Sequence, residues 1–454
     1  MFRPLGLARL SQRRPFSSST FQHAVHKSKS FSRKTKYDPS KDKKGPGKDK
    51  RFNKLVISEN YKKSATDQEV HERLPVFSAE NLHLDEVVKF KKTSYQKLHI
   101  LGAFKPNQFN ELYSRPITLS RKVETSQVHE FFTKSLLSSS KENRMIITGD
   151  LGVGKSTMLT QFHALAVEKD SVVLQISNMD ALVDGSNDFK YNNATGLYEQ
   201  PMASRDLLKK WFVLNKSVFN KINLSRPYSP AFESVKKQTP ITFTEKNTLR
   251  EVLGKVLYNP AVSRADVFQF LMDELAAQKE IPVFLTIDNF SALCHFANTR
   301  YRDINNNPIY FQKFQLLRTL VDFISGDRTF QKGAIVMATK SDHKDNDTIP
   351  VALGLREPDY YAKFDQWDRK FSEQLVKNGN LEHLHVQRMS REQVRALVEH
   401  MLECKMIPHE IEKRGFSRED NIQEVLPRLS EMEFLLSGNG NPRELYKNCV
   451  FSYI

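Results

Sequence analysis

The chain has 454 residues, of which 39% are hydrophobic and 10% aromatic, and its formal net charge is +16. This length is enough for two or three domains with cores of their own, and no apolar run approaches the length that crosses a bilayer, so membrane insertion is not expected. The three cysteines, Cys294, Cys404 and Cys449, lack the spacing of a disulfide framework or a zinc site, so neither is expected.

The excess positive charge lies in the first 54 residues, which hold 16 Lys or Arg and three acidic residues. Residues 1–23 alternate arginine with apolar side chains, contain no acid and include a run of serines, a composition typical of a mitochondrial targeting segment. The stretch from Arg14 to Ser19 resembles a two-step presequence cleavage site, so the mature chain is expected to begin near Phe16 or Ala24. The predicted location is therefore the mitochondrial matrix.

Residues 24–60 form a basic arm with few apolar residues, so a disordered N-terminus is expected. Its cations suit the phosphates of a nucleic acid, and Phe31, Tyr37 and Phe52 are available to stack on bases. The alternative is a solvated linker. Residues 61–140 carry no recognisable catalytic motif and are expected to wrap on the following domain, with a helix near 126–138 leading into it.

That domain, residues 141–388, begins with a short apolar run, a glycine-rich stretch and residues of helical apolar spacing. The glycine-rich stretch, Gly149-Asp150-Leu151-Gly152-Val153-Gly154-Lys155-Ser156, fits the phosphate-binding P-loop pattern. Glycines let backbone N–H groups turn toward phosphates at a helix N-terminus. Lys155 would reach the β- and γ-phosphates, and Ser156 would bind Mg²⁺. A glycine turn without a ligand is the alternative.

Strands and helices alternate after this loop, which predicts an α/β fold with a parallel sheet and helices on both faces, of the P-loop NTPase, AAA+-like type. Strands are expected at 171–176, 281–288, 333–338 and 384–386, and helices at 203–220, 247–257, 263–278 and 310–326. Trp211 and Phe212 are expected in the core. His383 and His385 share one face of a strand without an apparent third metal ligand, which favours a core or surface role.

The strand at 281–288 ends in Asp288, an arrangement that holds Mg²⁺ through water in P-loop proteins. Many ATPases of this architecture carry a glutamate at the next position to orient the attacking water. Asn289 stands there instead and has no proton-accepting carboxylate. Hydrolysis is therefore expected to be slow or absent.

The strand at 333–338 leads into Thr339-Lys340-Ser341-Asp342, for which two interpretations remain open. A polar residue at this position senses the γ-phosphate in AAA+-type proteins. The same four residues also fit the motif with which GTPases read guanine, with Asp342 accepting hydrogen bonds from the base. A polar loop without a ligand is the third possibility.

Residues 389–454 are expected to form a helical lid. Ser390 and Gln393 can cap a helix that extends to about Glu403, a second helix runs near 419–436, and a third starts at Asn441. Arg443, at the start of the third helix, occupies the place of a second nucleotide sensor, or it is a surface residue near a helix cap.

The P-loop strand, the block from Val172 to Phe189 and the segment from Gln200 to Trp211 together resemble the family of mitochondrial small-ribosomal-subunit proteins also called death-associated protein 3. The resemblance spans about residues 100–454, and the basic N-terminus is fungal in style. It implies a stable component of the small subunit with an AAA+-like P-loop domain that binds a guanine nucleotide. By position, Gly149 to Thr157 would bind the phosphates, and Asp288 would belong to the magnesium site.

Two hypotheses follow. The first is a structural protein of the mitochondrial small ribosomal subunit that contacts rRNA and neighbouring ribosomal proteins and holds GTP or GDP (ATP is possible) with Mg²⁺ and little hydrolysis. No homo-oligomer is expected. The second is a soluble mitochondrial ATPase or GTPase that acts as a switch or remodelling factor. Asn289 and the basic arm favour the first.

Overall fold

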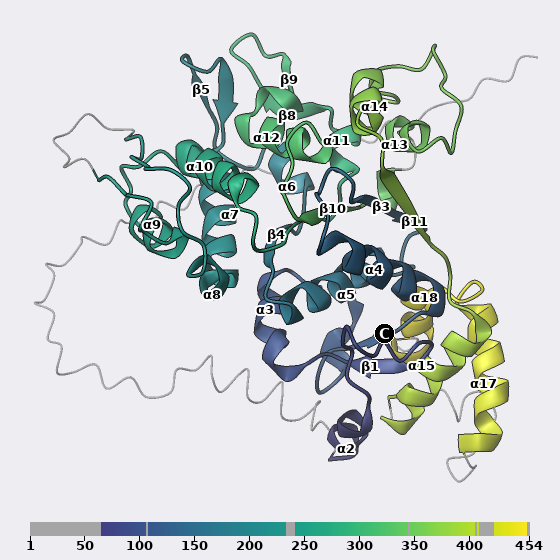
Figure 1. The fold of residues 1–454 in the computed structure, drawn as a ribbon. Coiled ribbons are helices and arrows are strands. Elements are labelled where there is room, and N and C mark those ends of the chain that lie inside the picture. Colours follow the sequence, from purple (N-terminus) through teal and green to yellow (C-terminus); the bar gives the residue numbers. More distant parts are fainter. Residues whose placement is uncertain are drawn as a thin grey trace, which may run out of the picture. The chain divides into compact units, whose positions relative to one another are not determined.

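The computed structural model describes residues 65–105, 108–232, 241–343, 346–404, 406–407 and 422–451 (Figure 1). Residues Lys63–Ile454 form one compact unit. The predicted targeting segment at 1–23 and the disordered basic arm at 24–60 lie outside the described residues.

Five parallel strands form the central sheet in the order β11-β3-β10-β7-β4. Their bounds are Leu381–Val386, Arg144–Gly149, Gly333–Ala338, Val283–Ile287 and Val172–Ile176, in the same order. β10, β7 and β4 are buried along their whole length, which is why they read as continuous apolar runs. The predicted parallel sheet is confirmed.

Helices cover both faces of this sheet, as predicted (Figure 1). Helices α4 (Lys122–Ser135) and α5 (Lys155–Glu168) pack on one face, where Phe132 and Phe162 contact Phe284 of β7. On the other face lie α7 (Pro201–Leu214), α10 (Arg264–Ala277) and α12 (Gln315–Ile324).

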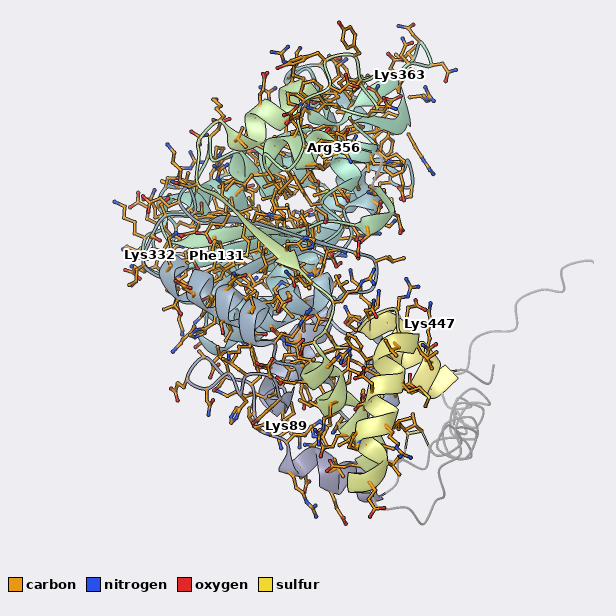
Figure 2. All side chains as sticks on the ribbon, turned by 90° about the vertical axis from the view of Figure 1, so that its right-hand side faces the viewer. Lys89, Phe131, Lys332, Arg356, Lys363 and Lys447 are labelled. Carbon is orange, nitrogen blue, oxygen red and sulfur yellow. The ribbon has the colours of Figure 1, made fainter. Side chains whose placement is uncertain are left out.

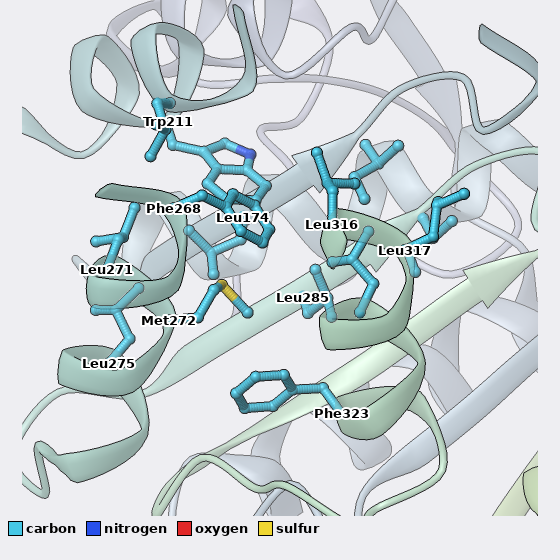
Figure 3. Packing of buried hydrophobic residues seen from close by; sticks show 14 of the residues in the cluster. Leu174, Trp211, Phe268, Leu271, Met272, Leu275, Leu285, Leu316, Leu317 and Phe323 are labelled. Atoms are coloured by element: carbon cyan, nitrogen blue, oxygen red, sulfur yellow. The ribbon is translucent and has the colours of Figure 1, made fainter. Parts of the chain in front are cut away.

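Figure 3 shows this second core. Trp211 and Phe268 pack over Leu174 and Leu285, with Phe323 nearby on α12, and their rings are at most 1% exposed. Neighbouring residues along each strand alternate between the two cores because side chains of a strand point to opposite faces. Trp211 and Phe212 are both buried, so the predicted core role is confirmed.

The predicted helix at 203–220 is divided by Asn215 into α7 and α8 (Lys216–Phe219). The Asn215 side chain accepts from the backbone N–H of Val173 and donates to its carbonyl, both at 2.9 Å. It thereby pairs the outer edge of β4, the last strand of the sheet, as a neighbouring strand would.

The remaining elements surround these layers. They are α2 (Ala65–Arg73), β1 (Val87–Lys89), α3 (Tyr95–Ile100), β2 (Ile117–Leu119), α6 (Asp180–Val183), β5 (Lys190–Asn192), β6 (Leu197–Glu199), α9 (Leu249–Val256), α11 (Ala292–His295), β8 (Asn298–Arg302), β9 (Pro308–Tyr310), α13 (Thr348–Ala352), α14 (Arg369–Val376), α15 (Arg391–Glu403), α17 (Ile422–Leu436) and α18 (Pro442–Tyr446). No helix within the described ranges is long and apolar enough to cross a bilayer.

The lid helices α15, α17 and α18 share a hydrophobic cluster with β1 and β2. Val87 and Ile117 from these N-terminal strands join Val398 and Leu429 of the lid. In Figure 2, Lys89 of β1 accordingly lies beside the lid helices, whereas Lys363 lies at the opposite end of the view. The wrapping region therefore contributes β1 and β2 to the hydrophobic core of the lid.

Candidate nucleotide-binding site

The glycine loop joins β3 to α5, and its glycines occupy backbone conformations that other residues rarely adopt. Gly149, Gly152 and Gly154 have φ values of 146°, 82° and 105°. A Cβ at Gly149 would lie 2.5 Å from the Val386 carbonyl oxygen, and one at Gly152 would lie 2.6 Å from Cβ of Arg443. No side chain caps α5 at its N-cap residue, Gly154, which leaves its first turn in the form that binds anions elsewhere.

A cavity of about 460 Å³ opens at the carboxyl ends of the strands, within the usual size range of small-molecule sites. It brings together most of the predicted residues: Leu151, Gly152, Val153, Gly154, Lys155, Ser156, Thr157, Asp288, Thr339, Lys340, Asp342 and Arg443. Gly149 and Asp150 are not in its wall. Lys105, Phe109 and Arg121, which the sequence did not single out, line it as well.

Lys155 is folded against the loop that carries it. Its ammonium group donates to the carbonyl oxygens of Gly149 (2.9 Å) and Asp150 (2.8 Å) and to Ser341 Oγ (2.5 Å). The residue is only 8% exposed. Phosphate oxygens could take the place of these neutral oxygen atoms without loss of hydrogen bonds.

Ser156 and Asp288 meet as the sequence predicted. The Ser156 hydroxyl donates to Asp288 Oδ2 at 2.9 Å, and Asp288 is 2% exposed. Asn289 has a φ of 59°, a left-handed conformation that asparagine tolerates well. Its amide donates to Asn178 and Asp180, at 2.8 and 3.0 Å, so it faces other side chains of the protein.

These oxygen atoms are of the kind that Mg²⁺ prefers, but the same Asp288 Oδ2 also forms an ion pair with the Lys105 ammonium. Lys105 further donates to the Ser177 carbonyl at 3.0 Å. A metal ion at Asp288 Oδ2 would place a second cation against the first. The residues therefore do not fit Mg²⁺ at this oxygen while Lys105 holds its position.

The loop from Thr339 to Asp342 follows β10, the strand between the P-loop strand β3 and the Asp288 strand β7. Ser341 Oγ lies 3.1 Å from the Gly149 carbonyl and also contacts Lys155. Thr339 Oγ1 donates to Ile147 O at 3.3 Å. Lys340 Nζ lies 3.7 Å from an oxygen of the half-exposed Asp342. The loop thus contacts the glycine-loop end of the cavity.

The lid touches the glycine loop directly. Asn441, the N-cap of α18, accepts from the backbone N–H of Arg443 at 3.0 Å and donates to the Leu151 carbonyl at 2.8 Å. Arg443 Nε is buried and has no hydrogen-bond partner in the part of the chain that the structure describes. Arg388 lies 3.3 Å from Asp150 and donates to the Gly438 carbonyl.

The capping box predicted at Ser390 and Gln393 is confirmed.

Arg121 also braces the loop, although no motif marked it. Its guanidinium donates to the carbonyls of Val153 (3.3 Å), Gln387 (2.8 Å) and Arg388 (3.1 Å), and it pairs with Glu124 at 2.8 Å. Burial lowers the pKa of the Arg121 guanidinium, and the nearby Glu124 charge opposes this shift. Neither Arg121 nor Lys105 had a local sequence signal, because both reach the site from the N-terminal wrapping region.

Two titratable groups lie behind Asp288. His163 of α5 pairs with Thr286 Oγ1 at 2.8 Å, and burial, together with the charges of Lys210 and Lys105, lowers the His163 pKa to about 3. Burial and then the charge of Lys105 lower the pKa of Lys210 to about 8. The positive charges on this side of the cavity therefore add to burial in lowering the pKa of neighbouring basic groups.

His383 and His385 both contact the hydroxyl of Thr148, at 2.6 and 3.1 Å. No group of three or more potential metal ligands occurs within the described residues. The contacts of both histidines are therefore with the P-loop strand.

In this parallel sheet the inner strand β3 leads through a glycine loop into a helix, and a buried aspartate follows the strand two places away. This arrangement defines an α/β protein with a loop of P-loop form. The family model for mitochondrial ribosomal death-associated protein 3 matches residues 118–448. The chain belongs to this family, as its resemblance predicted. Membership also confirms the predicted location in the mitochondrial matrix.

Two fungal relatives are both called small ribosomal subunit protein mS29. The Schizosaccharomyces pombe protein is 24% identical over 317 residues, which cover 69% of this chain and 64% of the relative. The Neurospora crassa protein is 21% identical over 415 residues, which cover 87% of this chain and 80% of the relative. The chain thus spans just under two thirds of the length of the S. pombe protein.

Among solved structures, the Aeropyrum pernix ORC2 protein in ADPNP and ADP complexes is 11% identical. The match covers 73% of this chain and 68% of that one. Its TM-score of 0.30 is too low to define the fold of this chain.

Proposed function

We propose that this protein is a structural constituent of the small subunit of the mitochondrial ribosome and that it holds a purine nucleotide with little or no hydrolysis. Family membership over residues 118–448 carries the ribosomal part of the proposal. The meeting of Lys155, Ser156 and Asp288 at one cavity carries the nucleotide part.

Three features of the cavity support a nucleotide ligand. The uncapped first turn of α5 and the Lys155 ammonium offer positive charge where phosphates would lie. The buried Arg443 Nε would find in a ligand the acceptor that it lacks. The cavity wall also joins the glycine loop to α18, so a bound nucleotide would hold core and lid together.

The position of β10 favours one of the two interpretations of the Thr339–Asp342 loop. Because this strand lies between β3 and β7, its end faces the space between Lys155 and Asp288. That space would receive the terminal phosphate, so we propose phosphate sensing by Thr339 or Ser341. Guanine recognition by Asp342 gains no support from this arrangement. GTP or GDP remains the nucleotide that the family resemblance implies, and ATP remains possible.

Slow hydrolysis follows from Asn289. Its amide cannot accept a proton from water, and its hydrogen bonds to Asn178 and Asp180 direct it toward protein groups. A nucleotide that is bound but not consumed still stabilises the fold, by about 4 kcal/mol at a thousand times its dissociation constant.

The ribosomal part is tested by sedimentation of a mitochondrial lysate in sucrose gradients at low and moderately high salt. We expect the protein to sediment with the small subunit at both salt concentrations, because an integral protein is held by more than surface charge. A free species near the top of the gradient, no heavier than the 52.5 kDa of the full sequence, would instead favour the soluble ATPase or GTPase.

The nucleotide part is tested by calorimetric titration of the purified protein with GDP, GTP and ATP, followed by single-turnover hydrolysis. We expect the protein to bind a nucleotide and to hydrolyse it more slowly than enzymes usually turn over their substrates. A rate on the order of 1 per second or faster would contradict the structural role of the nucleotide.

A further inference from the structure

The ion pair between Lys105 and Asp288 joins the wrapping region to the centre of the candidate site. Lys105 Nζ contacts the same carboxylate oxygen, Oδ2, that accepts the Ser156 hydroxyl at 2.9 Å. The Lys105 side chain is 32% exposed and the Asp288 side chain 3%. A cation supplied by the chain itself therefore lies where a P-loop protein holds its magnesium.

The backbone around Lys105 is fixed by packing on the end of β4. Gly102, with a φ of 80°, approaches Ser177 so closely that a Cβ would lie 2.8 Å from the Ser177 Cβ. The N–H of Ala103 donates to Leu98 at the end of α3. The ring of Phe104 packs 5.7 Å from that of Phe90, between ring centroids. These contacts fix the backbone just before Lys105, whose side chain reaches Asp288.

Lysine and a divalent cation compete for this carboxylate oxygen, whether the cation binds it directly or through a water molecule. An ammonium group is a compact charge with three donors, whereas Mg²⁺ needs oxygen ligands in an octahedron about 2.1 Å away. Asp288 is buried, so the repulsion between two cations at its Oδ2 would be weakly screened. Within the described residues, Lys105 is the cation that forms an ion pair with Asp288.

We propose that Lys105 is a built-in cation that competes with Mg²⁺ for Asp288 and so sets how strongly nucleotide binding depends on Mg²⁺. The proposal rests on the nucleotide site proposed above. In the native chain the ammonium group neutralises the negative charge of Asp288 beside the phosphates. Without it, the buried carboxylate repels the phosphates until a divalent cation binds.

The test compares full-length native protein with Lys105→Met and Lys105→Gln. GDP affinity is measured by calorimetry with excess Mg²⁺ and with EDTA. For each chain, the dissociation constant in EDTA is divided by the dissociation constant in Mg²⁺. We expect this ratio to rise at least tenfold in both variants. A ratio within threefold of the native value would overturn the proposal.

Lys210→Met is the matched control. It removes the same charge near the same strand end. Lys210, however, donates to Ser177 Oγ at 3.1 Å, and among the described residues it forms no ion pair with Asp288. We expect its ratio to stay near the native one. An equal rise in the control would show a general charge effect and would also overturn the proposal.

A second readout needs no nucleotide. Mn²⁺ binding to the nucleotide-free chains is followed by electron paramagnetic resonance, with Mn²⁺ as the probe for the divalent site. Removal of Lys105 should tighten Mn²⁺ binding at least tenfold, and Asp288→Asn in the same chain should abolish the gain. If GDP binds to none of the chains, the proposed nucleotide function fails, while the Mn²⁺ comparison still decides the role of Lys105. Unchanged Mn²⁺ affinity would refute that role.

Discussion

The two ends of β3, an inner strand of the sheet, each hold a buried cation, and the two are held in different ways. At the amino end, Arg144 is fully buried and its Nη1 donates to the carbonyls of Ile324 (3.1 Å), Ser325 (2.9 Å) and Leu375 (3.0 Å). At the carboxyl end, Lys155 donates to the carbonyls of its own loop and to a serine hydroxyl, beside an open cavity.

The difference separates a structural cation from one that can bind a ligand. The carbonyls around Arg144 come from the ends of α12 and α14, where helix dipoles place partial negative charge. They need the guanidinium because burial denies them water. The Lys155 partners lie at a cavity, so a ligand can replace them. Removing Arg144 should therefore damage the fold, and removing Lys155 should damage binding.

The largest effect is expected from Arg144→Leu. It leaves the Ile324 and Leu375 carbonyls without their guanidinium donor, whereas Ser325 O keeps a hydrogen bond from Asn378. At about 1–3 kcal/mol for each stranded carbonyl, urea unfolding should show a loss of about 4 kcal/mol. Arg369→Leu is the control, because its 62% exposed side chain pairs with an exposed glutamate and lies over the exposed ring of Tyr360. Equal losses in the two variants would break the comparison.

Lys155→Ala should have the opposite profile. The melting temperature of the nucleotide-free protein should change little, while the stabilisation by saturating GDP, about 4 kcal/mol at a thousand times the dissociation constant, should disappear. Thermal melts with and without GDP measure both quantities. If GDP still stabilises the variant as it does the native chain, Lys155 does not hold the phosphates.

His163 sharpens the comparison through pH. Its folded pKa of about 3 lies below the ordinary 6.5, so the unfolded chain takes up the proton first as the pH falls. The stability that this residue contributes is complete above about pH 6.5 and is lost between 6.5 and 3. From pH 7 to pH 5 the free energy of unfolding should fall by about 2 kcal/mol.

Urea unfolding at the two pH values measures this loss, and His163→Gln should remove most of it, since glutamine cannot titrate. An unchanged pH dependence in the variant would assign the loss to other groups.

The smallest effect is expected from Asp150→Asn in the glycine loop. The side chains of Asp150 and Arg388 are 50% and 46% exposed, and such pairs contribute about 0–1 kcal/mol. Asp327, near Arg144, accepts hydrogen bonds from Lys377, Asn378 and Ser325. Urea unfolding should therefore show a larger loss of unfolding free energy for Asp327→Asn than for Asp150→Asn. The reverse order would mean that the glycine loop supports the fold as much as the amino end does.

Much of the α/β domain could be predicted because its signals are local. The apolar runs of β10 and β7 ended where predicted to within a few residues, and Ser390 capped its helix as expected. The prediction missed α13 and α14 in the polar stretch at 343–380, where the Asp368 carboxylate caps α14 by accepting from Phe371 N–H. A polar composition concealed these short helices, which pack against the core through few residues such as Phe371.

The sequence by itself determined the glycine loop, the position of Asp288 and the presence of Asn289, because spacing along one strand and one helix defines them. Only the tertiary structure decided that β10 lies between β3 and β7, that β1 and β2 complete the lid, and that Lys105 lies on Asp288. The physical reason is distance along the chain: Lys105 and Asp288 are 183 residues apart. No periodicity or motif encodes a contact that arises from packing a separate segment against the end of a sheet.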